Sequence, residues 1–271
     1  MSDTLASQRG LVVTADPDCE AIAKELAAML GVPVAWGEGS ANSPFTLRVA
    51  RDGLSVTWRG GDAPLGTVRV NLEAGRPGRD PIVRAVRGSR RADTLHVVDA
   101  TAGLGKDALA LARAGMRVTA IERDPLLAVL LDDALHRGNQ AQDADLRELA
   151  NRMRVLQGDA RRLLGEVQPP PDVVVLDPMY PRLRGGAKRR DAAFLRAWLG
   201  EPSADATNEE RALLEVAQGV ASTRVVVKRP LKAPPLASGV SGSLRGATTR
   251  FDVYAGRRLA DATEPSTLEK A

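Results

Sequence analysis

The chain has 271 residues, of which 44% are hydrophobic and 27% charged, as in a globular protein with one large domain or a large and a small one. Its single cysteine, Cys19, excludes an intrachain disulfide, and its two histidines, His96 and His136, lack metal-ligand spacing, so no metal is expected. The formal net charge of +4 permits a polyanionic partner. With no signal peptide and no long apolar run, we expect no membrane span and a cytoplasmic protein.

Residues 1–75 predict a small α/β subdomain. Asp16 and Pro17 provide the chemistry of a helix start, and Asp52-Gly53 lies between two alternating segments, as in a hairpin. The expected elements are a strand at 10–16, a helix at 16–30, a hairpin at 45–60 and a strand at 66–72.

A basic connector is expected at 76–94. Its part 76–91 contains six arginines and one acid. This pattern suits either the solvated face of a helix or a strip that contacts phosphates.

Strands and helices alternate over 95–258, which predicts a doubly wound, mostly parallel, Rossmann-like sheet. The segments 182–209 and 231–249 are expected to form loops over the sheet, and 259–271 a C-terminal tail. The expected strands lie at 95–100, 117–122, 153–159, 172–177, 223–230 and 250–256, with helices at 106–115 and 125–138.

The stretch VVDATAGLGKDA (97–108) predicts a strand, a glycine turn and a helix start. Gly103 and Gly105 allow a ligand to approach the backbone closely. Acids end three successive strands: Asp99, then Glu122, placed for ribose hydroxyls, then Asp159, placed for the amino group of adenine. Each acid could instead cap a loop. A dinucleotide site stays open, although the full G-x-G-x-x-G is absent.

The stretch DPMYP (177–181) follows a buried strand. A carboxylate at Asp177 and the main-chain carbonyl of Pro178 could accept the N–H groups of a planar amine as it becomes cationic. Tyr180 offers a face on which a base can stack. The alternative is a strand that ends in a proline turn, with Tyr180 packed in the core.

Two motifs resemble those of methyltransferases. DATAGLG resembles the first motif of S-adenosylmethionine-dependent enzymes, with Thr101 in place of its first glycine, and DPMYP resembles the motif of enzymes that methylate planar nitrogens. Together with IERDPLLAVLLDDAL, VVVKRP and FDVYAG, they closely resemble the RsmJ family of bacterial 16S rRNA (guanine-N2)-methyltransferases over about 95–256. The family's own methionine in this motif accounts for Met179.

The resemblance implies a class I methyltransferase fold, S-adenosylmethionine as cofactor, and 16S rRNA or the small ribosomal subunit as partner. It implies catalytic roles for Asp177, Pro178 and Tyr180. Segment 71–88 has fewer glycines than is usual in the family. The donor contacts implied by the resemblance and by the strand-end pattern fall on Asp99, Gly103, Gly105, Lys106 (where arginine is usual), Asp107, Glu122, Arg123, Asp159, Ala160 (where small hydroxyl residues are common) and Asp177.

Basic residues follow the two strands at the expected ligand edge of the sheet. They could surround one cleft with positive charge and bind phosphates, or form solvated loops. The expected RNA contacts are Arg182, Arg184, Lys188, Arg189, Arg190, Lys228 and Arg229.

Other functions remain open from the residues alone. The acceptor motif does not distinguish guanine from adenine N6 or cytosine N4. A protein glutamine methyltransferase would also act on a planar amide, although the basic loops argue against it. A non-catalytic RNA-binding relic is the third alternative, against which Glu122 and Asp177 argue.

Overall fold

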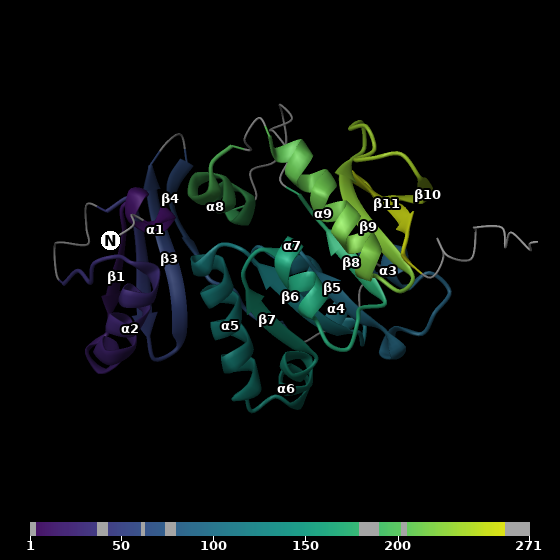
Figure 1. The fold of residues 1–271 in the computed structure, drawn as a ribbon. Coiled ribbons are helices and arrows are strands. Elements are labelled where there is room, and N and C mark those ends of the chain that lie inside the picture. Colours follow the sequence, from purple (N-terminus) through teal and green to yellow (C-terminus); the bar gives the residue numbers. More distant parts are fainter. Residues whose placement is uncertain are drawn as a thin grey trace, which may run out of the picture.

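The computed structural model describes residues 4–36, 43–60, 63–73, 80–178, 190–201 and 205–257. Within these ranges the strands form two sheets, one of four strands in the N-terminal part and one of seven strands after it (Figure 1). This α/β architecture confirms the predicted fold class.

The smaller sheet has the order β1-β2-β3-β4. β1 pairs with β2 in parallel, and the other pairs are antiparallel, so the predicted hairpin at 45–60 is confirmed as β2 and β3. Gly31, in the left-handed conformation, ends helix α2. The elements are α1 (Leu5–Gln8), β1 (Leu11–Ala15), η1 (Pro17–Cys19), α2 (Glu20–Leu30), β2 (Phe45–Ala50), β3 (Gly53–Gly60) and β4 (Ala63–Val68).

The larger sheet has the order β10-β11-β9-β8-β5-β6-β7. Its five strands from β9 to β7 are parallel, and β11 and β10 are antiparallel, which confirms the mostly parallel sheet. The strands are β5 (His96–Asp99), β6 (Arg117–Glu122), β7 (Met153–Gln157), β8 (Val173–Leu176), β9 (Arg224–Pro230), β10 (Val240–Arg245) and β11 (Thr249–Ala255).

Helices cover both faces of the larger sheet, which is why its central strands are rich in buried apolar residues. In β8, Val173 and Val175 pack into one hydrophobic cluster, and Val174 and Leu176 into another on the opposite face. The first face carries α3 (Pro81–Arg87), α4 (Lys106–Arg113), α5 (Pro125–Asn139) and α6 (Ala144–Asn151); the second carries α7 (Ala160–Leu163), η4 (Leu164–Glu166) and α9 (Ala206–Val220).

The prediction that 182–209 and 231–249 are loops is wrong. Helix α8 (Arg190–Leu199) and the start of α9 lie in the first segment, and strand β10 lies in the second. In α8 the only fully buried side chains are Phe194 and Trp198, too few for a clear helical pattern. β10 lies at the edge of the sheet and is largely exposed, so its sequence lacks apolar alternation.

The basic connector contains a helix. In α3, Ile82, Ala85 and Val86 are buried, whereas Arg84 and Arg87 are exposed. This arrangement matches the solvated-helix interpretation of the arginines, and phosphate contact stays a prediction.

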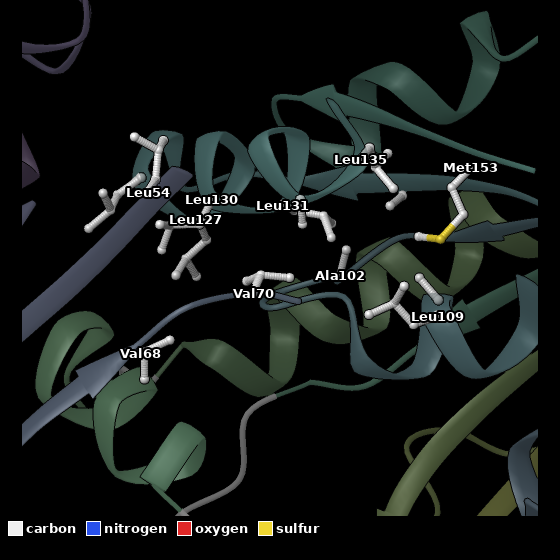
Figure 2. Packing of buried hydrophobic residues seen from close by; sticks show 14 of the residues in the cluster. Leu54, Val68, Val70, Ala102, Leu109, Leu127, Leu130, Leu131, Leu135 and Met153 are labelled. Carbon is white, nitrogen blue, oxygen red and sulfur yellow. The ribbon is translucent and has the colours of Figure 1, made fainter. Parts of the chain in front are cut away.

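A single hydrophobic cluster joins the two sheets. Phe45 of β2 contacts Trp198 of α8 edge-to-face, with ring centroids 5.0 Å apart, and Trp58 of β3 lies 5.4 Å from Phe194. Figure 2 shows Leu54 of the small sheet near Leu127 and Leu130 of α5. The proposed division at residue 75 therefore separates two sheets that share one core.

Candidate active site

The central strands of the larger sheet bring two predicted acids to the same edge. β5 and β8 are neighbours, but the chain runs from β5 out to β6 and β7 before it returns to β8 on the other side. Ligands of open α/β sheets bind at the carboxyl ends of strands where the order reverses in this way. Asp99 ends β5, and Asp177 follows β8 directly.

The predicted glycine turn lies between β5 and α4, and both glycines have a positive φ, 55° at Gly103 and 74° at Gly105. A Cβ on Gly105 would lie 2.5 Å from Cδ1 of Leu131, so this glycine is required for packing. A Cβ on Gly103 would meet no atom within 4 Å. Gly103 therefore borders open space on the ligand edge, where a bound molecule could approach the backbone.

Glu122 holds this turn in place. Its Oε2 accepts a 2.6 Å hydrogen bond from the amide of Gly103, and its Oε1 a 2.7 Å bond from the amide of Asp124. Burial raises the pKa of Glu122, and the two amides act in the opposite direction. A carboxylate has about four acceptor positions, so two remain for the hydroxyls of a ligand.

Asp99 is the most deeply buried acid at this edge, with 2% of the residue exposed. Burial, followed by the negative charge of Asp107, raises the pKa of Asp99 to about 8, although the amide of Thr101 donates to it and Lys228 lowers it. Asp99 is therefore mainly a neutral carboxyl group at pH 7.

Asp177 is held from two directions. Its backbone amide donates a 2.7 Å hydrogen bond to the hydroxyl of Thr101 in the glycine turn. Its Oδ2 lies 2.7 Å from Nζ of Lys228, which also lies 2.8 Å from Oδ2 of Asp107 in the first turn of α4. Burial raises the pKa of Asp177, and Lys228 opposes this shift. The predicted donor side and acceptor side are thus connected through one ammonium group.

The residues after the third parallel strand are also placed at this edge. Asp159 caps α7 by accepting from the amide of Arg161, and the Arg161 guanidinium, 2.6 Å from Oδ2, lowers the pKa of Asp159. Ala160 is buried behind it. Lys106 and Arg123 are exposed, and Arg123 lies 3.6 Å from Glu209.

Part of the predicted acceptor and RNA site lies outside the described residues, namely Met179, Tyr180, Arg182, Arg184, Lys188 and Arg189. Pro178 is buried, and Arg190 is exposed at the start of α8. Lys228 and Arg229 point into the fold. Arg229 is 6% exposed, donates to the carbonyl of Pro234 and lies 3.7 Å from Glu210. Lys228 binds Asp107 and Asp177, so both basic side chains are engaged within the fold, and phosphate binding by either residue stays a prediction.

Two contacts escaped the sequence analysis. The sequence marks Thr101 only as a departure from a glycine motif, whereas its hydroxyl accepts a hydrogen bond from the backbone amide of Asp177. Trp198 donates from Nε1 to Oδ2 of buried Asp124, 2.9 Å away, and so ties α8 to the start of α5. For the contact of Thr101, the sequence signal is a polar residue at a position where the motif has a glycine.

Within the described ranges, no three histidine, cysteine or acidic residues are grouped so that they could hold a metal ion. None of the helices in those same ranges is long and apolar enough to cross a membrane.

A family described as "Putative SAM-dependent methyltransferase" matches residues 40–256. A relative from Alkalilimnicola ehrlichii, named ribosomal RNA small subunit methyltransferase J, is 42% identical over 260 residues, which cover 90% of this chain and 94% of the relative. The chain belongs to this methyltransferase J family. A member from Thioalkalivibrio sulfidiphilus is 42% identical over 94% of the chain and 99% of its own length, and one from Pseudomonas aeruginosa is 37% identical over 96% and 99%.

A crystal structure of a SAM-dependent methyltransferase from Neisseria gonorrhoeae has the same fold as this member of the J family. Its TM-score is 0.66 at 29% identity, and the match covers 90% of this chain and 96% of that one. The comparisons confirm the suggested family, its fold and S-adenosylmethionine as its cofactor. The open side of Gly103 and the fixed carboxylate of Glu122 fit such a donor.

Proposed function

We propose that this protein transfers a methyl group from S-adenosylmethionine to the exocyclic N2 amine of a guanine in 16S ribosomal RNA. The observation that carries the proposal is the hydrogen bond between Thr101 and Asp177, because it fixes the predicted acceptor carboxylate against the donor turn. The names of the relatives, which are ribosomal RNA small subunit methyltransferases, support the substrate class.

The donor supplies an electrophilic methyl group on a sulfonium ion. We assign its ribose hydroxyls to Glu122 and its adenine amino group to Asp159, while Gly103 lets its chain pass close to the backbone. Lys106, Asp107, Arg123 and Ala160 stay proposed contacts around these groups. Asp159 already accepts from Arg161, so the adenine would share this carboxylate with the guanidinium.

The protein positions the guanine amine through Asp177 and Pro178. The lone pair of such an amine is delocalised into the ring, so it is a weak nucleophile. A carboxylate oxygen of Asp177 and the carbonyl of Pro178 accept its two N–H bonds and stabilise the positive charge that develops on nitrogen. Tyr180 stacks on the base after the base leaves its own stack. The extra proton leaves the nitrogen after transfer, with Asp177 as the nearest proposed acceptor.

Phosphate contacts of the RNA are assigned to Arg190 and to the basic residues of 182–189. Among the predicted contacts, Arg190 is the described residue whose side chain is exposed, and it is the first residue of α8. Neutralised phosphates release counterions, so RNA binding should weaken steeply as salt increases.

Small subunits from a strain that lacks this protein provide the test. The purified chain should transfer labelled methyl groups to their 16S RNA, and digestion should give N2-methylguanosine. Asp177→Asn should abolish transfer but retain donor binding by calorimetry. Methylated adenosine or cytidine would replace the guanine assignment, and label in protein would favour a glutamine methyltransferase. If the chain binds the donor but transfers no label to RNA, an RNA substrate is refuted. If the chain does not bind the donor, a non-catalytic relic is favoured.

A further inference from the structure

We infer that Lys228 is a positioning residue for methyl transfer, whose ammonium group holds Asp177 as an ionised, oriented acceptor and couples it to Asp107 at the donor turn. This inference rests on the proposed function, because it assigns a role within the same site. It replaces the phosphate contact that the sequence predicted for this lysine.

The geometry places the ammonium group between two carboxylates from different elements. Lys228 lies on β9, which pairs with β8 so that Val227 is opposite Leu176, the last residue of β8. Asp177 follows that residue, and Asp107 comes from the first turn of α4. The two Nζ–Oδ2 distances, 2.7 Å to Asp177 and 2.8 Å to Asp107, are those of charge-assisted hydrogen bonds.

The charges around Asp177 explain why such a cation is needed. Among the described residues, its titratable neighbours are Asp107 on α4, Asp99 at the end of β5 and Lys228 on β9. Burial and the charge of Asp107 raise the pKa of Asp177, whereas Lys228 lowers it. Without Lys228, three acids would share one partly buried site, and Asp177 would tend to bind a proton. A protonated Asp177 has an acceptor position fewer for the N–H bonds of the substrate.

Lys228 is suited to hold this position and not to exchange protons. Burial alone would lower its pKa, but Asp177 and Asp107 together raise it above the ordinary value of a lysine. The group therefore stays an ammonium ion throughout the working pH range. Because it binds Oδ2 of Asp177, we assign Oδ1 to the substrate amine.

The decisive experiment compares the pH dependence of kcat in two variants. Lys228→Met removes the charge that keeps Asp177 ionised, so the acidic limb of the profile should move up by about 1–3 pH units. Because the pKa of Asp177 is about 6 in the natural protein, activity at pH 7 should then fall between about twofold and about a hundredfold and partly recover at pH 9. Asp107→Asn removes a charge of opposite effect, so its acidic limb should move down. A purely structural role would not give shifts of opposite sign.

Stability provides a readout that needs neither donor nor RNA. Lys228→Met leaves Asp107 and Asp177 without their shared cation, so its melting temperature should fall more at pH 8 than at pH 5, where Asp177 can be protonated. Lys24→Met is the matched control, because this substitution makes the same chemical change at an exposed site on α2. Lys228→Arg keeps the charge and should retain the acidic limb of the natural protein. If Lys228→Met fails to fold, the arginine variant and Asp107→Asn still test the inference through their pH profiles.

The outcomes separate the inference from its alternatives. If Lys228→Met methylates with an unchanged pH profile but binds RNA with a salt slope smaller by about one, the residue is a phosphate contact and the inference is refuted. If neither the profile nor the slope changes, it is refuted as well. A natural chain that binds donor but methylates no RNA would refute the proposed function, while the pH-dependent loss of stability would still report on the ion cluster.

Discussion

The hydroxyl of Thr101 accepts a 2.7 Å hydrogen bond from the backbone amide of Asp177, and so joins the turn after β5 to the end of β8. Thr101 stands where the general donor motif has a glycine, and a glycine could not make this bond. The contact sets the distance between the proposed donor site and the proposed acceptor.

Replacing Thr101 with valine should therefore impair transfer more than donor binding. Valine keeps the shape but leaves the amide of Asp177 without its acceptor, which should lower the free energy of unfolding by about 1–3 kcal/mol. The value of kcat should fall while the donor affinity, measured by calorimetry, stays close to that of the natural protein. Thr101→Ser keeps the hydroxyl and is the control. Equal activity of the serine and valine variants would contradict this role.

The two glycines of the turn should respond differently to alanine. Both have a positive φ, so each variant carries a left-handed alanine, which costs about 1–2 kcal/mol. Gly105→Ala also drives a Cβ to 2.5 Å from Leu131 and should lower the melting temperature clearly further. Gly103→Ala projects into open space, so its main effect should be weaker donor binding. Thermal unfolding and calorimetry on both variants distinguish the two effects.

Asp99 should limit stability at neutral pH. Its folded pKa of about 8 exceeds the ordinary value of 3.8, so its contribution to stability is complete below pH 4 and is lost as the pH rises towards 8. Asp99→Asn should thus unfold at higher urea concentration than the natural protein at pH 7.5, with a smaller difference at pH 5. Asp132→Asn, at an exposed site on α5, is the control. An Asp99→Asn variant that is less stable at pH 7.5 would contradict the prediction.

The shared core predicts that the N-terminal sheet cannot be removed. A chain that begins at residue 76 would expose Phe194 and Trp198, which are 0% and 1% exposed in the whole protein. It would also lose Leu54, which lies near Leu127 and Leu130 of α5 (Figure 2). We expect such a chain to aggregate or to lack a cooperative thermal transition in calorimetry. A soluble truncated chain with a sharp transition would show that 1–75 is an independent unit.

Much of the fold could be predicted from the sequence because the central strands are buried on both faces. β5, β6 and β8 consist mainly of buried residues, and an acid ends or directly follows each strand, which indicates both the sheet and its ligand edge. Helix α8 was missed because its two large buried side chains pack on a different sheet, and β10 because an exposed edge strand needs no apolar alternation.

The sequence predicts which residues form the site better than it predicts the contacts between them. Acids at strand ends can be located one by one, but the bonds of Lys228 depend on which strands become neighbours and in which register. The sequence does not distinguish a lysine that binds a phosphate from one that binds a carboxylate. The role of Lys228 follows from the packing of β8, β9 and α4 around its ammonium group.

The packing of α8 on the small sheet also has a consequence for synthesis. Phe45 and Trp58 leave the ribosome long before Phe194 and Trp198, the side chains that cover them, have been translated. At about 5–20 residues per second, this apolar face waits on the order of ten seconds for its partner. A nascent chain of this protein therefore exposes an apolar sheet face during about half of its own translation, and its yield in the cell should depend on chaperones that bind nascent chains.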